Sequence, residues 1–307
     1  MTATLELRPY GRTNEQVTVI GLGGGYLDKH SLADGIATVH RALDLGINYF
    51  DTAPVYGQGA SQVILGNALE KRTEPYLLAT KIGFLAQSAA YRSPDALRSQ
   101  LWESLRALRR SHVDILQIHL AELACWWKSG VPEEQLLNPD ETYKFTDAPV
   151  MEVLCEAKAQ GICRFFGITS DHAEQITYVL RGIEVDACLV AYEYTLLHRN
   201  ALRTVLPLIR EKGTAYIPVG VFKTIGADRG QSPVPRLNDI QRGCGLSLIE
   251  LTVRYLIADP CITTILVGAS TPEELEESVL AAQAGPLPPD LHRTLDELET
   301  PKSSIED

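Results

Sequence analysis

Four residues of this sequence carry side chains that could together move a proton: Asp51, Tyr56, Lys81 and His119. A free tyrosine has a pKa of about 10, too high for efficient proton exchange near neutral pH. A close ammonium group favours the phenolate and lowers that pKa, while a carboxylate paired with the lysine offsets the cost of burying it. An imidazole could then orient a substrate oxygen. The set predicts an acid/base site facing a carbonyl or an alcohol, and its most natural reaction also needs a redox cofactor.

Each of the four residues also has an ordinary structural explanation. Asp51 could cap a helix, Lys81 could neutralise any nearby carboxylate, and a histidine after a strand is usually a hydrogen-bonded structural residue. Their shared position favours chemistry, because burying several charges at one place costs free energy unless the groups pair or react.

The elements that must position these residues alternate regularly between short β-rich runs and amphipathic helical stretches. Ser93 and Pro94 begin a helix whose leucines lie on one face, and Thr271 and Glu274 have capping-box spacing at the start of the last long helix. Strands are expected at 17–23, 47–50, 76–81, 113–119, 163–169, 186–192, 213–219 and 262–268.

Eight strand–helix pairs predict a (β/α)8 TIM barrel that forms one domain over residues 1–307; a doubly wound open sheet is the alternative. In such a barrel, catalytic side chains stand at the carboxyl ends of the strands and in the loops that follow. Asp51, Lys81 and His119 lie at the ends of three consecutive predicted strands, and Tyr56 lies in the loop after the first of these. We therefore expect all four at one rim.

Composition and charge exclude several classes of function. Lys and Arg number 28 and Asp and Glu 39, a net charge of −11 spread along the chain, which argues against nucleic acid or an anionic membrane as partner. No apolar run has the length of a signal peptide or a membrane span. The six cysteines lack CxxC spacing, so we expect reduced thiols in a cytoplasmic protein. No metal-ligand set is visible, and the oligomeric state is left open.

Three motifs, "GINYFDTAPVYG", "LATKIG" and "VDILQIHL", occur in an order and spacing that resembles the aldo-keto reductases. The resemblance covers nearly the whole chain and implies the same barrel. It also implies that Tyr56 is the general acid/base, that Lys81 and Asp51 tune it, and that His119 orients the substrate oxygen. The implied reaction transfers a hydride between the C4 atom of NAD or NADP and a carbonyl or alcohol carbon. "GLGGG" at 21–25 lacks the full GxGxxG pattern of a Rossmann phosphate loop.

The same resemblance indicates where a cofactor would lie, with departures from the family pattern. Thr169 and Ser170 stand where the family usually has Ser-Asn, and Ala191 stands where a glutamine is often found. Glu273 and Glu274 disfavour the 2′-phosphate of NADP and so favour NAD. Alternatively, Glu274 only completes a capping box, and backbone N–H groups at the helix N-terminus still hold a phosphate. The implied cofactor positions are Gly24, Gly25, Thr169, Ser170, Pro218, Gly220, Gly268, Ala269, Ser270 and Glu274.

Two long rim loops, 121–149 and 223–245, are expected to select a small-molecule carbonyl, alcohol or sugar-like lactol. Tyr26, Trp126 and Trp127 could wall a sugar or an aromatic ring; alternatively, the two tryptophans only fold their loop onto the barrel. The loop 223–245 is rich in glycine and is expected to move over the cofactor. A cofactor-binding regulatory subunit with little turnover is the alternative function. A metal-dependent lyase or isomerase would require converging carboxylates and histidines, which the sequence does not show.

Overall fold

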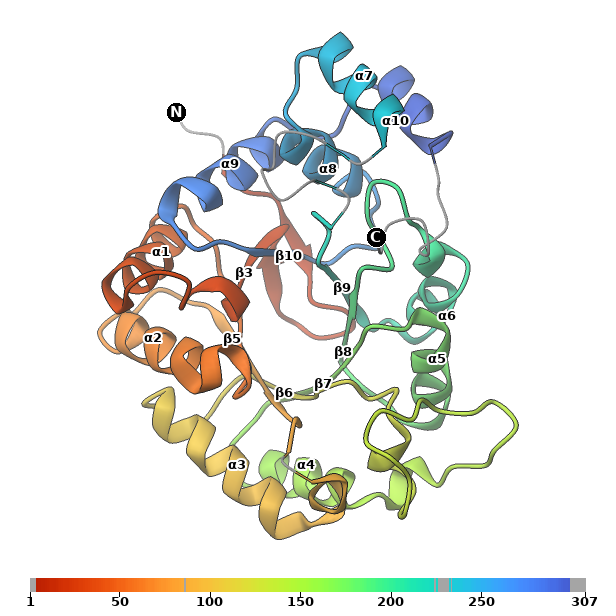
Figure 1. Ribbon diagram of the computed structural model, residues 1–307. Helices are drawn as coiled ribbons and strands as arrows, with labels where there is room; N and C mark the ends of the chain where they lie inside the picture. Colours follow the sequence, from red (N-terminus) through yellow and green to blue (C-terminus); the bar gives the residue numbers. More distant parts are fainter. Residues whose placement is uncertain (1–3, 86, 224, 226–231, 233, 299–307) are drawn as a thin grey trace.

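A closed barrel of eight parallel strands forms the centre of the protein (Figure 1). The computed structural model describes residues 4–85, 87–223, 225, 232 and 234–298. Neighbouring strands follow the order β10-β3-β4-β5-β6-β7-β8-β9, which confirms the predicted TIM barrel and excludes the open sheet. The strands are β3 (Ile20–Gly23), β4 (Tyr49–Asp51), β5 (Leu77–Ile82), β6 (Ile115–Ile118), β7 (Phe165–Ser170), β8 (Ala187–Ala191), β9 (Ala215–Val219) and β10 (Ile265–Gly268).

Helices surround the barrel, and several begin at the residues that the sequence indicates (Figure 1). The Ser93 hydroxyl accepts from the backbone N–H of Ala96, as predicted for a helix N-cap. The helices are α1 (Leu32–Asp44), α2 (Ala60–Leu69), α3 (Pro94–Ala107), α4 (Pro149–Ala159), α5 (Ala173–Gly182), α6 (Val205–Lys212), α7 (Pro235–Cys244), α8 (Leu248–Leu256), α9 (Pro272–Gln283) and α10 (Pro289–Asp296).

The segment 223–245, which we expected to be a loop, contains helix α7. Pro235 begins this helix, and Gly245 ends it with a positive φ of 72°. The helical pattern is short and has only one buried residue, so the sequence signal for it is weak. Residues 224, 226–231 and 233 lie outside the described residues, and with them most of the glycine-rich part of the predicted mobile loop.

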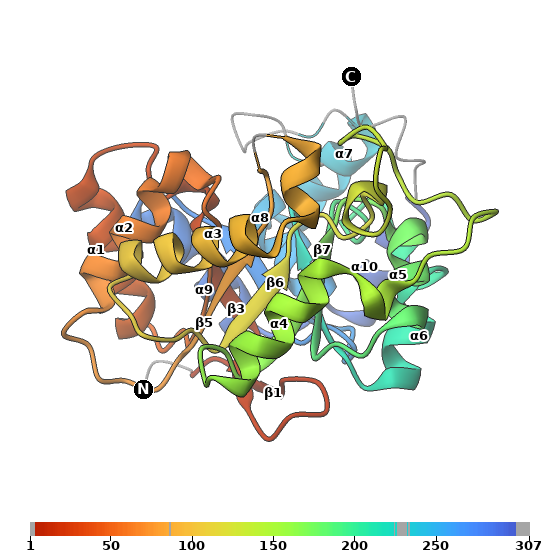
Figure 2. The ribbon, with the colours of Figure 1, turned by 90° about the horizontal axis from the view of Figure 1, so that it is seen from below.

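The predicted strand 17–23 is in fact two strands with different partners. β2 (Gln16–Thr18) pairs antiparallel with β1 (Leu7–Pro9), whereas only β3 joins the barrel. Between them the N–H of Val19 donates to Glu6, outside the barrel ladder. The β1–β2 hairpin lies beneath the barrel, at the end opposite the long loop 121–149 (Figure 2). Tyr10 of this hairpin is fully buried and packs against Tyr49 of β4, with ring centroids 5.8 Å apart.

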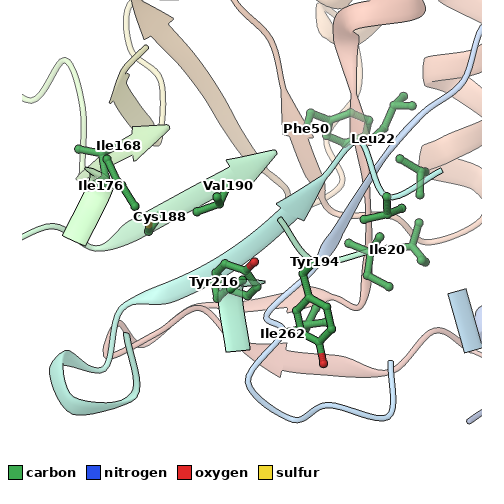
Figure 3. Close-up of a cluster of buried hydrophobic side chains, with 14 of the residues drawn as sticks. Ile20, Leu22, Phe50, Ile168, Ile176, Cys188, Val190, Tyr194, Tyr216 and Ile262 are labelled. Atoms are coloured by element: carbon green, nitrogen blue, oxygen red, sulfur yellow. The ribbon is translucent and has the colours of Figure 1, made fainter. Parts of the chain in front are cut away.

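Alternate residues of each strand face either the barrel interior or the surrounding helices. On β5, Leu77 and Ala79 belong to the interior cluster with Tyr10, whereas Leu78 and Ile82 belong to the larger outer cluster. Figure 3 shows part of that outer cluster, including Ile20, Leu22, Phe50, Ile168, Cys188 and Val190. The same alternation turns Asp51, Lys81 and Gln117 into the interior, since they are two residues from Tyr49, Ala79 and Ile115 respectively.

Backbone strain gathers at the carboxyl ends of the strands. Among the described residues, five that are not glycine have positive φ. Four of these follow a barrel strand, with φ between 52° and 63°: Gln58, Phe84, Leu120 and Tyr192. Such conformations cost about 1 kcal/mol or more each and often mark functional sites. This rim is therefore the place to look for a site.

Candidate active site

A buried ion pair inside the barrel mouth links strands β4 and β5. The ammonium of Lys81 donates to Asp51 Oδ1 and, over 2.9 Å, to the backbone carbonyl of Thr52. Both side chains are at most 1% exposed. Burial alone would lower the pKa of Lys81, but Asp51 and Tyr56 outweigh it and the pKa lies above its ordinary value. Lys81 therefore stays charged.

Tyr56 lies beside this pair, at the start of the single-turn helix η2 (Tyr56–Gly59). Its ring centroid is 4.8 Å from the ammonium nitrogen of Lys81. Burial of its hydroxyl raises the pKa of Tyr56 and Lys81 opposes that rise, but the pKa still ends above the ordinary value. This corrects the expectation of a lowered pKa, because that expectation did not weigh the burial of the hydroxyl. Tyr56 is a phenol that holds its proton at neutral pH.

His119 directly follows β6 and completes the group. Its ring is perpendicular to that of Tyr56, with centroids 5.9 Å apart, and it packs against the ring of Phe84 at 4.6 Å. Burial, and then the charge of Lys81, hold the pKa of His119 well below its usual range, so the imidazole is neutral. Its Nδ1 atom has no hydrogen-bond partner among the described residues. The structure thus brings all four predicted residues to one place.

Thr169 and Ser170, the predicted contacts for a carboxamide, are buried at the end of β7 and are already engaged. The Thr169 hydroxyl accepts from the N–H of Leu120. The Ser170 hydroxyl donates to the carbonyl of His172 and accepts from its N–H. Both hydroxyls therefore hold the local backbone. Each keeps further hydrogen-bonding capacity, so their contact with a cofactor stays a prediction.

Two predicted glycines lie beneath tyrosine rings at the rim. A Cβ atom on Gly220 would come within 2.3 Å of the Tyr192 ring, and one on Gly268 within 2.4 Å of the Tyr26 ring. The absent side chains let these aromatic rings approach the backbone closely. Tyr192 also has a raised pKa, through burial first and then the charge of Asp171 and the nearby Tyr26 and Tyr56.

Of the other backbone positions predicted to contact the cofactor, most are buried and one is exposed. A Cβ on Gly24 would meet the Ser61 hydroxyl at 2.3 Å, so this glycine serves contact with α2. Gly25 is exposed, with open space around it. Pro218 and Ala269 are buried, the latter in the outer cluster. Neither Gly24 nor Ala269 presents a free surface to a ligand.

Glu274 makes contacts that the capping-box prediction does not include. Thr271 caps α9 by accepting from the N–H of Glu274, as predicted. The Glu274 carboxylate, however, accepts from both the N–H and the hydroxyl of Ser270, over 2.8 and 2.9 Å. A carboxylate thus occupies both donors of Ser270, just before the start of this helix.

Trp126 and Trp127 are buried beneath the long loop, 0% and 5% exposed. Their indole N–H groups donate to the carbonyls of His119 and Ala121, over 3.2 and 2.8 Å. Trp127 also packs against Phe145 from the far end of the loop. The indoles therefore hold the loop on the barrel, which argues against their predicted role as a substrate wall. Tyr26, in contrast, is 53% exposed at the rim.

Three further residues at the site were not singled out in the sequence. Gln117 donates to Asp51 Oδ2 over 2.5 Å from within β6. Its signal was a polar residue in an apolar strand, two positions before His119 and so on the same face. Phe84 and Tyr192 each follow a strand by one or two residues, but nothing in the sequence marks their positive φ.

Other kinds of site are not seen in the described part of the chain. Within residues 4–298, masked positions apart, no group of three His, Cys, Asp or Glu side chains could hold a metal ion. No described helix is long and apolar enough to cross a membrane. All six cysteines are free thiols.

Comparison with known proteins gives a consistent result. The model of the aldo/keto reductase family matches residues 19–300. L-galactose dehydrogenase of Arabidopsis thaliana is 30% identical over 90% of this chain and 88% of its own length. Pyridoxal 4-dehydrogenase of Microbacterium luteolum is 27% identical over 90% and 92%. The holo form of aldo-keto reductase AKR11C1 from Bacillus halodurans has the same fold, with a TM-score of 0.78, 24% identity and coverage of 96% and 97%.

Proposed function

Because the chain belongs to the aldo-keto reductase family, we propose that it is an NAD(P)-dependent oxidoreductase acting on a small carbonyl or alcohol, with Tyr56 as its general acid/base. The two relatives named above are dehydrogenases, and nicotinamide cofactors are those the family uses. The proposal treats the barrel and its rim loops as one domain. The free thiols are consistent with a reducing, cytoplasmic location.

The observation that carries the proposal is a protonated phenol lying beside a buried, paired ammonium. Tyr56 can donate its proton to a carbonyl oxygen because it keeps that proton at neutral pH. The phenolate left behind lies next to Lys81, whose charge Asp51 holds in place. Neutral His119, close to Tyr56, can hydrogen-bond the same substrate oxygen without competing for the proton.

A nicotinamide, when bound, supplies or accepts the hydride. Two features of the chain fit such a ring at the mouth. Tyr192 lies against Gly220 and close to Tyr56. The Lys223 ammonium lies over its ring, 4.8 Å from the centroid, and would have to move aside for a flat ring to stack there. The Nδ1 atom of buried His119 has no partner among the described residues, as suits a group that meets a ligand. Thr169 and Ser170 would support the backbone of this cradle.

The contacts of Glu274 favour NAD over NADP in this proposal. A 2′-phosphate at the start of α9 would need the donors of Ser270, but the Glu274 carboxylate already accepts from both of them. Bringing a phosphate dianion there would also place like charges together. Side-by-side steady-state kinetics test this, and a clear preference for NADPH would contradict it.

The names of two relatives support a polar substrate with a carbonyl, alcohol or lactol carbon, since they are dehydrogenases of L-galactose and of pyridoxal. The rim is suited to such a molecule. Tyr26 and Phe84 are 53% and 46% exposed there, and aromatic faces can pack against a sugar or a planar ring. Phe84 also contacts His119, so a substrate held against it lies beside the proposed site.

Replacing the phenol tests the proposal most directly. A Tyr56→Phe variant should bind cofactor like the wild type, measured by quenching or transfer of NADH fluorescence. Its turnover should fall by at least about 100-fold, the usual scale of general acid/base help. Tyr178→Phe is the matched control, because Tyr178 is a half-buried residue of α5 away from the site.

Turnover would be followed with a panel of aldehydes, ketones and sugars, in both directions and with both cofactors. Near wild-type turnover in Tyr56→Phe would show that the phenol is not the acid/base. Absence of any NAD(P)H oxidation or NAD(P)+ reduction across the panel would instead favour a regulatory protein.

A further inference from the structure

We propose that Gln117 is a positioning residue for this site, one that holds Asp51 so that Lys81 stays close to Tyr56. The inference rests on the proposed function and concerns a residue outside the four-residue set. It follows from contacts inside the barrel, one layer below the mouth.

Gln117 and Lys81 divide the Asp51 carboxylate between them. The Gln117 amide donates to Oδ2 over 2.5 Å, and the Lys81 ammonium donates to Oδ1. All three side chains are essentially inaccessible to solvent. The two donors come from adjacent strands in register, because Lys81 on β5 is the direct partner of Gln117 on β6. Each oxygen thus has its own donor.

The neighbouring strand leaves room for this amide. Gly167 on β7 is the register partner of Gln117, and a Cβ atom there would lie 2.7 Å from the Gln117 Cγ. Glycine in a strand interior costs about 0.5–1 kcal/mol relative to alanine. Any other residue at this position would push Gln117 away from its present place.

The side-chain amide of Gln117 has one polar atom engaged and one unengaged. Its second polar atom, Oε1, is buried and has no hydrogen-bond partner among the described residues. A methionine or leucine would avoid this unsatisfied oxygen, but only by leaving the buried Asp51 Oδ2 without its donor. What only the amide offers is the N–H directed at Asp51.

The amide affects Tyr56 through the position of the ammonium. Without a donor on Oδ2, we expect the ammonium to be drawn toward that oxygen as well, and so away from the phenol. The Lys81 charge would then oppose the effect of burial less strongly, and the pKa of Tyr56 would rise further. The charged or titratable groups around Asp51 are Lys81 on β5, Tyr56 and Tyr49 from β4 and its loop, His119 after β6, and Tyr10 from the hairpin below.

The test is the pH profile of kcat for carbonyl reduction in two variants, one altered on β6 and one altered on β7. Gln117→Met removes the donor, and Gly167→Ala displaces Gln117 without touching Asp51. In both, the alkaline limb of the profile should move to higher pH, by about half a unit or more. Turnover at neutral pH should fall by about 10-fold, while KM for cofactor and substrate changes by less than about 2-fold.

Gly182→Ala on α5 is the control for overpacking, since its Cβ would meet Phe145 at 2.2 Å, outside the barrel. It should lower stability and leave the profile in place. A wild-type profile in Gln117→Met, or a shift to lower pH, would overturn the inference. Should that variant fail to fold, Gly167→Ala decides by the same criterion. If Tyr56→Phe also keeps full turnover, the proposed function itself fails; if only the Gln117 result is negative, the function stands.

Discussion

Replacing Lys81 should lower both the stability of the barrel and its turnover, and a second substitution should restore only the stability. A Lys81→Met variant leaves the Asp51 carboxylate buried, with the Gln117 amide as its remaining side-chain donor among the described residues. The carboxylate loses its counter-charge, and the Thr52 carbonyl loses its donor. Breaking a buried pair by removing one partner costs about 3–5 kcal/mol, because the other charge stays uncompensated. We expect a loss of that size, together with loss of turnover.

A second substitution should restore most of the lost stability without restoring activity. Asp51→Asn, added to Lys81→Met, removes the uncompensated charge, so most of the lost stability should return. Turnover should stay low, because Tyr56 still lacks the ammonium that stabilises its phenolate. The double-mutant cycle thus gives one result for stability and another for catalysis.

Urea unfolding followed by tryptophan fluorescence measures the stability term, because Trp126 and Trp127 are buried in the loop that covers the barrel. The reasoning is refuted if Lys81→Met costs less than about 1 kcal/mol. It is equally refuted if the double variant is no more stable than Lys81→Met, since the cost would then not come from the charge left on Asp51.

Two further predictions concern single carboxylates. Glu274→Lys should free the Ser270 donors and raise the ratio of kcat/KM for NADPH over NADH by about 10-fold, or about 1.4 kcal/mol. The same change at the exposed neighbour, Glu273→Lys, should alter this ratio much less. Equal effects of the two variants would contradict the assigned role of Glu274. Burial raises the pKa of Glu122 from 4.5 to about 7. Between these two pH values the folded protein keeps a proton that the unfolded chain has lost. The stability of the folded protein therefore falls as the pH rises from about 4.5 to about 7. Glu122→Gln keeps an acceptor for the N–H of Asp171 and should gain about 3 kcal/mol over wild type at pH 8 but nothing at pH 4, measured by urea unfolding; a constant difference at both pH values would refute the titration.

The barrel and the place of the four polar residues could be predicted from the sequence because both follow from regular patterns. Strand runs alternate with helices, and parallel strands bring their carboxyl ends to one rim. Asp51, Lys81 and His119 therefore met there as expected. Their proton affinities could not be predicted equally well, because burial depends on every neighbour. The raised pKa of Tyr56 is the clearest case.

Other differences have local physical causes. The run 17–23 has no break in its apolar pattern, yet Val19 turns to Glu6 and divides it into two strands. The hydroxyls of Thr169 and Ser170 form hydrogen bonds with nearby backbone groups, which the sequence does not show. Trp126 could have faced inward or outward on a loop of this length. Only the folded structure shows that its indole N–H donates to the backbone carbonyl of His119, which turns the ring inward.

The hairpin beneath the barrel has a kinetic consequence. Tyr10 and Val17 close the lower end of the interior and are themselves 0% exposed. Solvent deuterons must therefore reach the Lys81 ammonium and the Gln117 amide mainly from the mouth. A ligand bound at the mouth would block this route. The rate of hydrogen–deuterium exchange at these buried groups would then be limited by the rate at which the ligand dissociates.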